Sequence, residues 1–280
     1  MLNKQKEKDE FLAKLKHFAG SLSTDIVDEN DFWKIKGFID SSKRIYSIST
    51  DTKIISKIIE IQVFPLLLKF ARENDFDLIL AECQNWYPDV SLVNKHNKEI
   101  KFAIDLKTTY KDEKANDRCN GFTLGSHGEY FINRSSTKNI QFPYNEYLGH
   151  YCLGFIYSRN DINKNEELTI HNLNDLENIK SVIKNFIFFA EEKWKIASDK
   201  GGSGNTANIG SIRSIKDILG GNGTFAKAGE EIFDDYWCNF GKIEITKINE
   251  KTGKICNKKM TSFKEYIKYR NLSEELLNNG

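Results

Sequence analysis

The chain has 280 residues, of which 39% are hydrophobic and 29% are charged, and its formal net charge is +1. This composition excludes an intrinsically disordered chain, and the near-zero net charge argues against a protein that coats nucleic acid without sequence preference. No apolar run approaches the length of a membrane span, and Met1 to Lys8 lack the apolar core of a signal peptide, so we expect a cytoplasmic protein that binds no membrane.

The N-terminal half of the chain contains helix-like and strand-like patterns. Apolar residues recur at helical spacing from about Lys6 to Phe18 and from about Thr52 to Glu73, where Pro65 predicts a kink. Short apolar runs separated by polar turns then predict strands. These runs are Leu78 to Ala81, Val90 to Val93 and Phe102 to Leu106, and the runs Tyr151 to Tyr157 and Phe186 to Ala190 extend the same predicted sheet.

The order of these elements predicts an α/β or α+β fold, with a mixed central β-sheet flanked by helices. We expect one domain over residues 1–280, with a catalytic core at about 50–160 and mostly helix and loop after Gly220. The C-terminal segment, about 241–280, is basic, because residues 241–270 carry nine Lys or Arg against three acids. Contacts with phosphate and ordinary solvated lysines are both consistent with that charge.

The cysteines lie far apart in the sequence, at Cys83, Cys119, Cys152, Cys238 and Cys256. Their odd number and the absence of a Cys-x-x-Cys spacing favour neither a disulfide framework nor a zinc site. We interpret them as reduced thiols.

The predicted strand near residue 104 carries an acid and a lysine on one face. Side chains alternate along a strand, which sends Phe102, Ile104 and Leu106 to one face and Asp105 and Lys107 to the other, away from the core. By itself, Asp-x-Lys on a strand is usually a salt bridge.

A second carboxylate precedes the neighbouring strand. Asp89 follows Pro88 at the start of that strand, where proline is tolerated, so a hairpin could bring Asp89 and Asp105 to the same sheet edge. Two adjacent carboxylates repel each other unless a cation lies between them, and such hard oxygen ligands suit Mg²⁺. The sequence therefore predicts a magnesium site beside a lysine.

Three motif blocks together resemble the EcoRV family of type II restriction endonucleases, which belong to the PD-(D/E)xK nucleases. The blocks are Thr-Asp-Thr-Lys at Thr50 to Lys53, Gln-Asn-Trp-Tyr-Pro-Asp at Gln84 to Asp89, and Ala-Ile-Asp-Leu-Lys-Thr-Thr-Tyr at Ala103 to Tyr110. The resemblance extends, with gaps, from about residue 11 to about residue 240. It implies a homodimer that holds double-stranded DNA in a cleft and cuts each strand by attack of water on phosphorus.

The resemblance also implies roles for individual residues. Asp89 and Asp105 match the family's metal-binding carboxylates, whose Mg²⁺ polarises the scissile phosphate and stabilises the leaving oxygen. Lys107 matches the catalytic lysine, which stabilises developing charge and orients or deprotonates the attacking water. Glu60 matches a further catalytic carboxylate at the metal site; a helix-edge acid paired with Lys57 or Lys53 is the alternative.

The glycine-rich segment at about 199–211 is expected to read the DNA sequence. Composition alone predicts a flexible linker there. The resemblance instead implies a major-groove recognition loop, in which asparagine pairs with adenine and a threonine methyl packs on thymine. The matching positions are Gly202, Ser203, Gly204, Asn205 and Thr206.

Three further positions match family residues that lie near DNA. Gln84 matches a minor-groove position, although Cys83 and Trp86 replace its family neighbours. Thr109 and Lys138 match positions near the DNA backbone, where contacts orient the protein without reading sequence. A solvated surface lysine is the alternative for Lys138.

Taken together, these features predict a dimeric, magnesium-dependent enzyme that cuts the palindrome GATATC to blunt ends. A repair or recombination nuclease with the same core motif would recognise DNA structure or DNA ends and would lack a sequence-reading loop. A DNA-binding module with an inactive site is the alternative from another class, and the intact Asp89, Asp105 and Lys107 argue against it.

Overall fold

The computed structural model describes residues 3–83, 85–204, 207–248 and 255–277. Its main sheet has the strand order β10-β8-β5-β4-β3, with β6 paired to the end of β5. Strands β5 and β8 are parallel and their neighbours antiparallel, so the sheet is mixed, as the sequence predicts. These strands are β3 (Phe76–Leu80), β4 (Val90–Asn94), β5 (Lys101–Asp112), β6 (Ala115–Cys119), β8 (Gly149–Arg159) and β10 (Ile183–Glu192).

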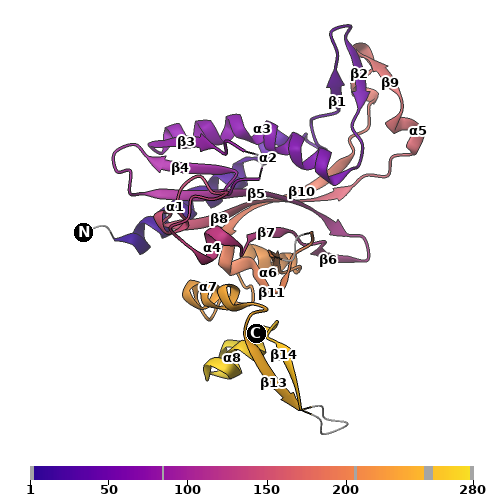
Figure 1. Ribbon diagram of the computed structural model, residues 1–280. Helices are drawn as coiled ribbons and strands as arrows, with labels where there is room; N and C mark the ends of the chain where they lie inside the picture. The colour runs from indigo at the N-terminus through magenta and orange to yellow at the C-terminus, as the bar shows by residue number, and fades with distance from the viewer. Residues whose placement is uncertain (1–2, 84, 205–206, 249–254, 278–280) are drawn as a thin grey trace.

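Two long helices cover one face of this sheet, with α3 drawn above it in Figure 1. Helix α1 (Lys4–Ser21) contains the first predicted helix, and α3 (Thr52–Glu73) has the predicted bounds. Asp51 begins α3 because its carboxylate accepts hydrogen bonds from the Lys53 and Ile54 amides. The helix continues through Pro65. Both helix predictions are therefore confirmed.

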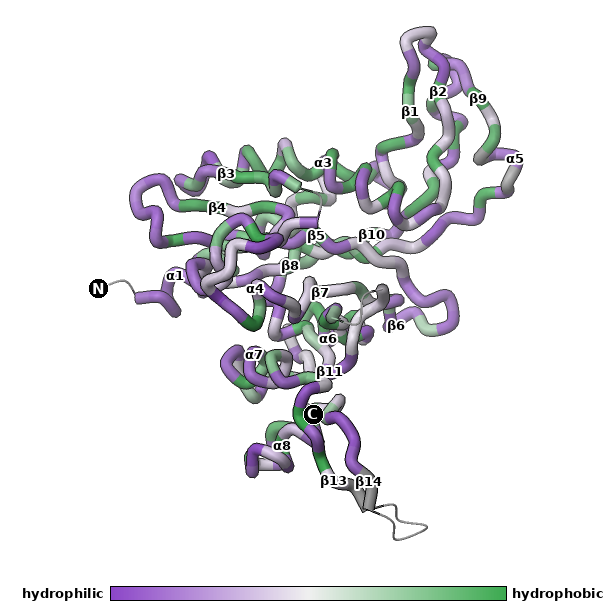
Figure 2. Tube along the Cα trace, in the orientation of Figure 1, coloured by the Kyte–Doolittle hydropathy of each residue, from purple (hydrophilic) through white to green (hydrophobic). Residues whose placement is uncertain are grey.

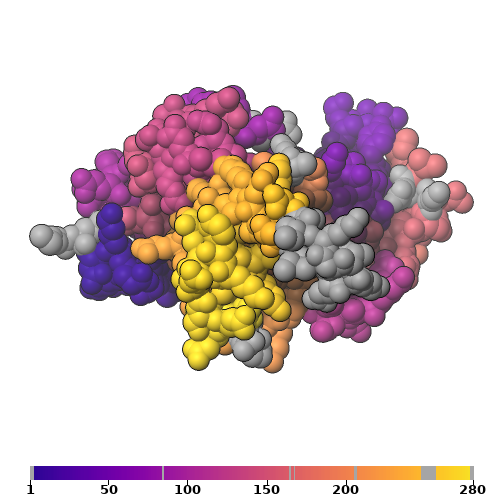
Figure 3. Space-filling model, turned by 60° about the horizontal axis from the view of Figure 1, so that its bottom comes forward, coloured from indigo at the N-terminus to yellow at the C-terminus, as the bar shows by residue number. Residues whose placement is uncertain are grey.

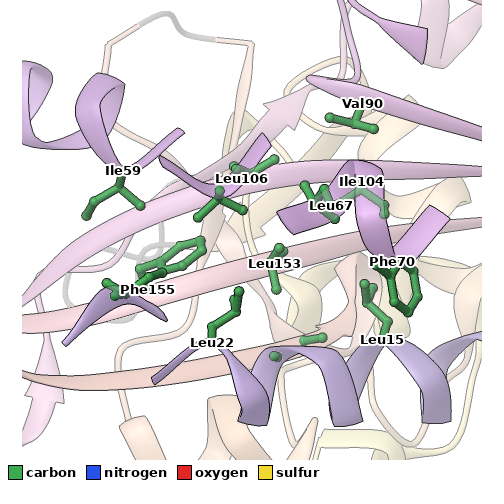
Figure 4. Close-up of a cluster of buried hydrophobic side chains, with 14 of the residues drawn as sticks. Leu15, Leu22, Ile59, Leu67, Phe70, Val90, Ile104, Leu106, Leu153 and Phe155 are labelled. Atoms are coloured by element: carbon green, nitrogen blue, oxygen red, sulfur yellow. The ribbon is translucent and has the colours of Figure 1, made fainter. Parts of the chain in front are cut away.

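The main sheet is buried on both faces. Side chains of α1, α3, β5 and β8 form the first core, in which Leu15, Ile59 and Leu153 converge (Figure 4). Phe102, Ile104 and Leu106 point into it, as predicted. The other face is not open, which corrects the prediction for Asp105 and Lys107. Ala103, Cys152 and Ile156 join a second core there, because the C-terminal third of the chain packs against that face.

The second core lies between the main sheet and a layer of short elements, which is drawn below the sheet in Figure 1. A three-stranded sheet of order β11-β12-β7 and the helices α6, α7 and α8 contribute to it. The prediction of mostly helix and loop after Gly220 misses a hairpin, β13–β14. Seen from below, the C-terminal residues, in yellow, stand forward on this face (Figure 3). These elements are β7 (Thr123–Ser126), β11 (Ala197–Gly201), β12 (Asn208–Ser211), α6 (Ile215–Gly220), α7 (Glu230–Asn239), β13 (Glu244–Ile248), β14 (Ile255–Lys259) and α8 (Phe263–Arg270).

A small sheet of order β1-β2-β9 projects beyond the main sheet, and its strands carry hydrophobic positions (Figure 2). Its strands are β1 (Gly37–Ile39), β2 (Arg44–Ser47) and β9 (Ile170–Asn172). The remaining helices are short turns: α2 (Ser23–Ile26), α4 (Glu129–Ile132), η1 (Tyr144–Glu146), α5 (Lys164–Glu167), η2 (Leu173–Asn178), η3 (Lys193–Ile196) and η4 (Glu274–Leu277).

Two further features bear on the sequence predictions. Among the described residues, no helix has the length and apolar character needed to cross a membrane. Four cysteines, at 83, 119, 152 and 238, are free thiols in the structure. The side chain of Cys256 lies outside the described part of the chain.

Candidate active site

Strands β4 and β5 bring the two predicted aspartates together. Val90 pairs with Ile104 in the antiparallel ladder. Asp89 directly precedes Val90 and Asp105 directly follows Ile104. In an antiparallel pair this places the two acids opposite each other. The Leu106 amide donates a hydrogen bond of 2.7 Å to Asp89 Oδ2. This hydrogen bond fixes one carboxylate against the strand that carries the other.

Lys107 completes the group. Its Nζ lies 2.7 Å from Asp105 Oδ2, and its side chain is 22% exposed. Asp105 is only 6% exposed. Apart from this ion pair, Asp105 Oδ2 is buried without a hydrogen-bond donor in the described part of the chain. Leaving a buried carboxylate oxygen without a donor is costly, so this atom is suited to a cation.

Burial and mutual repulsion shift the proton equilibria of these groups. Burial, followed by the charge of Asp105, raises the pKa of Asp89 to about 7. Burial alone would lower the pKa of Lys107, but the charges of Asp105 and Asp89 outweigh it and the pKa is raised. Lys107 is therefore a cation at neutral pH. Asp89, in contrast, takes up a proton near neutral pH.

Glu60 lies in the same cavity as Asp89 but forms no cluster with the aspartates. The cavity, of about 570 Å³, lies between α3 and the ends of β3–β5, and Thr108 also lines it. Lys57 Nζ lies 2.7 Å from Glu60 Oε1, which is the helix-edge ion pair considered as the alternative. In the described residues no three acidic, histidine or cysteine side chains are grouped closely enough to hold a metal. The structure thus brings together Asp89 and Asp105, with Glu60 apart from them.

The aspartate pair nevertheless suits a divalent cation. Mg²⁺ is commonly held by one or two carboxylates together with waters and substrate phosphates, and needs no complete protein cage. Asp105 Oδ2 is buried with the Lys107 ammonium as its partner, and the pKa of Asp89 is raised, so both carboxylates are ones that a further cation would stabilise. The donor set therefore fits a hard divalent metal.

The segment at 199–211 is a strand pair, not a linker. Strands β11 and β12 pair at Gly201 and Ile209, and the Gly202 amide donates to the Asn208 carbonyl at 2.7 Å. Asn208 Nδ2 also donates to the Ser203 carbonyl, at 2.7 Å. Gly204 has a φ of +91°, which favours glycine. Ser203 and Gly204 are exposed at the tip. Asn205 and Thr206 lie outside the described residues.

The other predicted DNA-contacting residues are Gln84, Thr109 and Lys138; of these, the structure describes Thr109 and Lys138, which differ in exposure. Lys138 is exposed. Thr109 is only 4% exposed, and its hydroxyl donates to the Gly121 carbonyl at 3.0 Å. This burial argues against a direct contact of Thr109 with DNA, because the hydroxyl already joins β5 to the segment before β7. Gln84 lies outside the described residues, and its neighbour Cys83 lines the cavity of Asp89.

Sequence reasoning missed Lys193, which is 3% exposed beneath the site. Its ammonium lies 4.9 Å from the ring centre of Tyr87 and 5.4 Å from that of Phe131. Burial lowers its pKa to about 8, against the opposing charge of Asp105. The cation–π contact with Lys193 helps to hold the ring of Tyr87 in place, and Tyr87 lies two residues before Asp89. The charged run around Lys193 resembles an exposed turn, so the sequence gives no signal for this role.

Comparison with known proteins gives the family of this fold and site. A family model described as restriction endonuclease EcoRV matches residues 29–271. The chain belongs to this EcoRV endonuclease family. The type II restriction enzyme EcoRV of Escherichia coli is 36% identical over 251 residues, which cover 88% of this chain and 96% of that enzyme. As a member of the EcoRV family, the chain is a restriction endonuclease, a divalent-metal-dependent hydrolase whose substrate is double-stranded DNA.

Proposed function

We propose that this chain is a Mg²⁺-dependent type II enzyme that cleaves the palindrome GATATC and leaves blunt ends. The observation that carries the proposal is the convergence of Asp89, Asp105 and Lys107 where β4 and β5 meet. The specificity part rests on the loop at 199–211, whose sequence keeps the family's reading residues.

In the proposed mechanism the carboxylates of Asp89 and Asp105 would hold the cation where β4 and β5 pair. Mg²⁺, when bound, polarises the phosphate and stabilises charge on the leaving oxygen. The ammonium of Lys107 stabilises the negative charge that develops on the phosphoryl oxygens and orients the attacking water. Because Lys107 is already fixed by Asp105, little reorganisation precedes the reaction.

Glu60 has a supporting role in this proposal. Its carboxylate lines the cavity of Asp89 from α3, and it would serve as a further ligand to the cation once its ion pair with Lys57 is broken. The pair with Lys57 is half exposed and therefore weak, so exchanging it for a cation contact costs little.

DNA reading is proposed for the tip of the β11–β12 hairpin. Gly202, Ser203 and Gly204 offer backbone groups to base edges, and Asn205 and Thr206 supply the adenine and thymine contacts. Lys138 is exposed and would bind a backbone phosphate, while Gln84 approaches the minor groove. The basic segment at 241–280 adds further attraction for phosphate.

A homodimer follows from the proposed palindrome, because a two-fold symmetric site is read by two copies of the same loop. The projecting β1-β2-β9 sheet offers a surface for the second copy, since large apolar side chains stand exposed on and around it. They are Phe38, Ile39, Tyr46, Leu168, Ile170, Leu173 and Leu176. Ile39→Asp should turn a dimer into a monomer in analytical ultracentrifugation; a wild-type monomer bound to its cognate duplex would contradict this arrangement.

Sequencing of fragment ends after digestion with Mg²⁺ tests the proposal, because it reports activity, site and cut position together. We expect discrete fragments with blunt ends within GATATC. Products that depend on DNA junctions or ends would favour a repair nuclease, and binding without cleavage would favour an inactive module. We also propose a cytoplasmic location, where a restriction enzyme meets incoming DNA, and one domain over 1–280 with its core at about 50–160.

A further inference from the structure

A polar groove of about 690 Å³ lies beside the recognition hairpin and apart from the aspartate pair. One wall is formed by residues of β11 and β12, together with Gly202 and Ser203, which follow β11 and lead into the loop tip. The other wall is the end of β6 and the turn after it, from Asp117 to Phe122. Arg118 and Ser214, which both line the groove, pair in an isolated antiparallel β-bridge. The groove is therefore built from the same strand pair that presents the loop.

Positive charge dominates this groove. Arg118, Lys200 and Arg213 line it, against a single acid, Asp117. Lys200 Nζ lies 3.3 Å from Asp199 Oδ2, so part of its charge is already compensated. Arg118 and Arg213 are exposed, and neither forms an ion pair with any described residue. Two guanidinium groups are thus available to an anion.

Glycines keep the groove open next to these arginines. Gly121 has a φ of +76°, and a Cβ at this position would lie 3.4 Å from Arg213 Cγ. A Cβ at Gly210 would lie 2.7 Å from the Lys200 carbonyl oxygen, too close for any other residue. The Ser198 hydroxyl donates to the Gly210 carbonyl at 3.1 Å. Gly210 therefore allows β12 to lie close against β11 along this wall of the groove.

We propose that this groove binds a phosphodiester group of the cleaved duplex, outside the base pairs that the loop reads. The inference rests on the proposed function, because it requires the hairpin to face DNA. Guanidinium groups match phosphate oxygens with paired hydrogen bonds. Any duplex held by the tip of the hairpin continues past its walls, which brings a backbone phosphate to Arg118 and Arg213.

Such a contact fixes how the hairpin sits on the duplex without reading a base. It also makes affinity depend on DNA that flanks the recognition site. Each phosphate contact releases a condensed counterion, so the slope of log Kd against log salt concentration measures the number of contacts. The salt dependence therefore reports directly on the two arginines.

The test compares Arg118→Ala and Arg213→Ala with the wild type by fluorescence anisotropy in Ca²⁺ over a range of salt concentrations. Each variant should lose about 0.9 from the slope per phosphate contact removed. Arg72→Ala is the matched control: it removes the same charge from an exposed position at the end of α3, on the opposite face of the sheet, and should keep the wild-type slope. Asp117→Asn should tighten binding. All four positions are exposed, and thermal melting checks the fold.

Duplex length supplies a second measurement. Extending a duplex by one helical turn on each side of the site should strengthen wild-type binding more than binding of the Arg118→Ala, Arg213→Ala double variant. Equal gains, or slopes unchanged in both single variants, would overturn the inference. A wild type that binds DNA without preference for any sequence would instead refute the proposed function.

Discussion

Replacement of Lys107 by alanine should abolish most cleavage while leaving DNA binding in place. The ammonium is fixed 2.7 Å from Asp105 Oδ2 and is positioned before the substrate arrives. Losing one such preorganised donor costs about 100-fold to 1,000-fold in rate, or about 2.7–4 kcal/mol. The charge of Lys107 also lowers the pKa of Asp89, so its removal raises that pKa further above 7 and weakens the metal site. We therefore expect a loss at the upper end of this range.

Single-turnover cleavage in Mg²⁺ gives the rate, and anisotropy in Ca²⁺ gives binding. Lys101→Ala is a matched control, because Lys101 lies on the same strand and the same face, with an ion pair of 3.0 Å to Glu146. It lies about 20 Å from Lys107, from roughly 3.3 Å per strand residue. The control should cleave at the wild-type rate. If Lys107→Ala cleaves as fast as this control, the assignment of Lys107 is wrong.

Three further predictions follow from the same geometry. Asp89→Ala or Asp105→Ala should weaken divalent-metal binding together with activity, because each carboxylate supplies a ligand. Calorimetric titration of the DNA complex with the metal measures this binding. Unchanged metal binding in both variants would exclude the two residues as ligands. Because the pKa of Asp89 is raised to about 7, a proton should compete with the metal below pH 7 and leave the carboxylate free to bind it above pH 7. The apparent Mg²⁺ affinity should therefore level off above pH 7 and fall, by up to about tenfold per pH unit, below it. An affinity that stays the same from pH 5 to pH 8 would contradict this. Asn205→Ala should lose about 1–3 kcal/mol of discrimination in each half-site, roughly 30-fold to 20,000-fold for a dimer. Its nonspecific affinity and the salt dependence of that affinity should be retained. A variant that keeps the wild-type preference over one-base variants of the site would mean that the loop does not read sequence.

Local sequence pattern predicted the elements with strong periodicity. The apolar repeat predicted α3 at Thr52–Glu73, and alternation placed Phe102, Ile104 and Leu106 on the face of the first core. Short polar strands such as β6 and the β13–β14 hairpin carry little apolar periodicity, so their pairing depends on neighbours far away in the chain. For the same reason, composition predicted a linker where β11 and β12 pair.

The sequence by itself also determined the residue types of the site, since the motif blocks with Asp89, Asp105 and Lys107 carried the family resemblance. Tertiary structure decided how much water surrounds them. The C-terminal third of the chain covers the face that alternation had left open. Burial in the folded chain raises the pKa of Asp89, and Lys193 lies near the rings of Tyr87 and Phe131. Burial depends on which distant segment packs against a strand, and no local pattern encodes that choice. Only the folded chain, therefore, could reveal the buried lysine beneath the site and the arginine groove beside the loop.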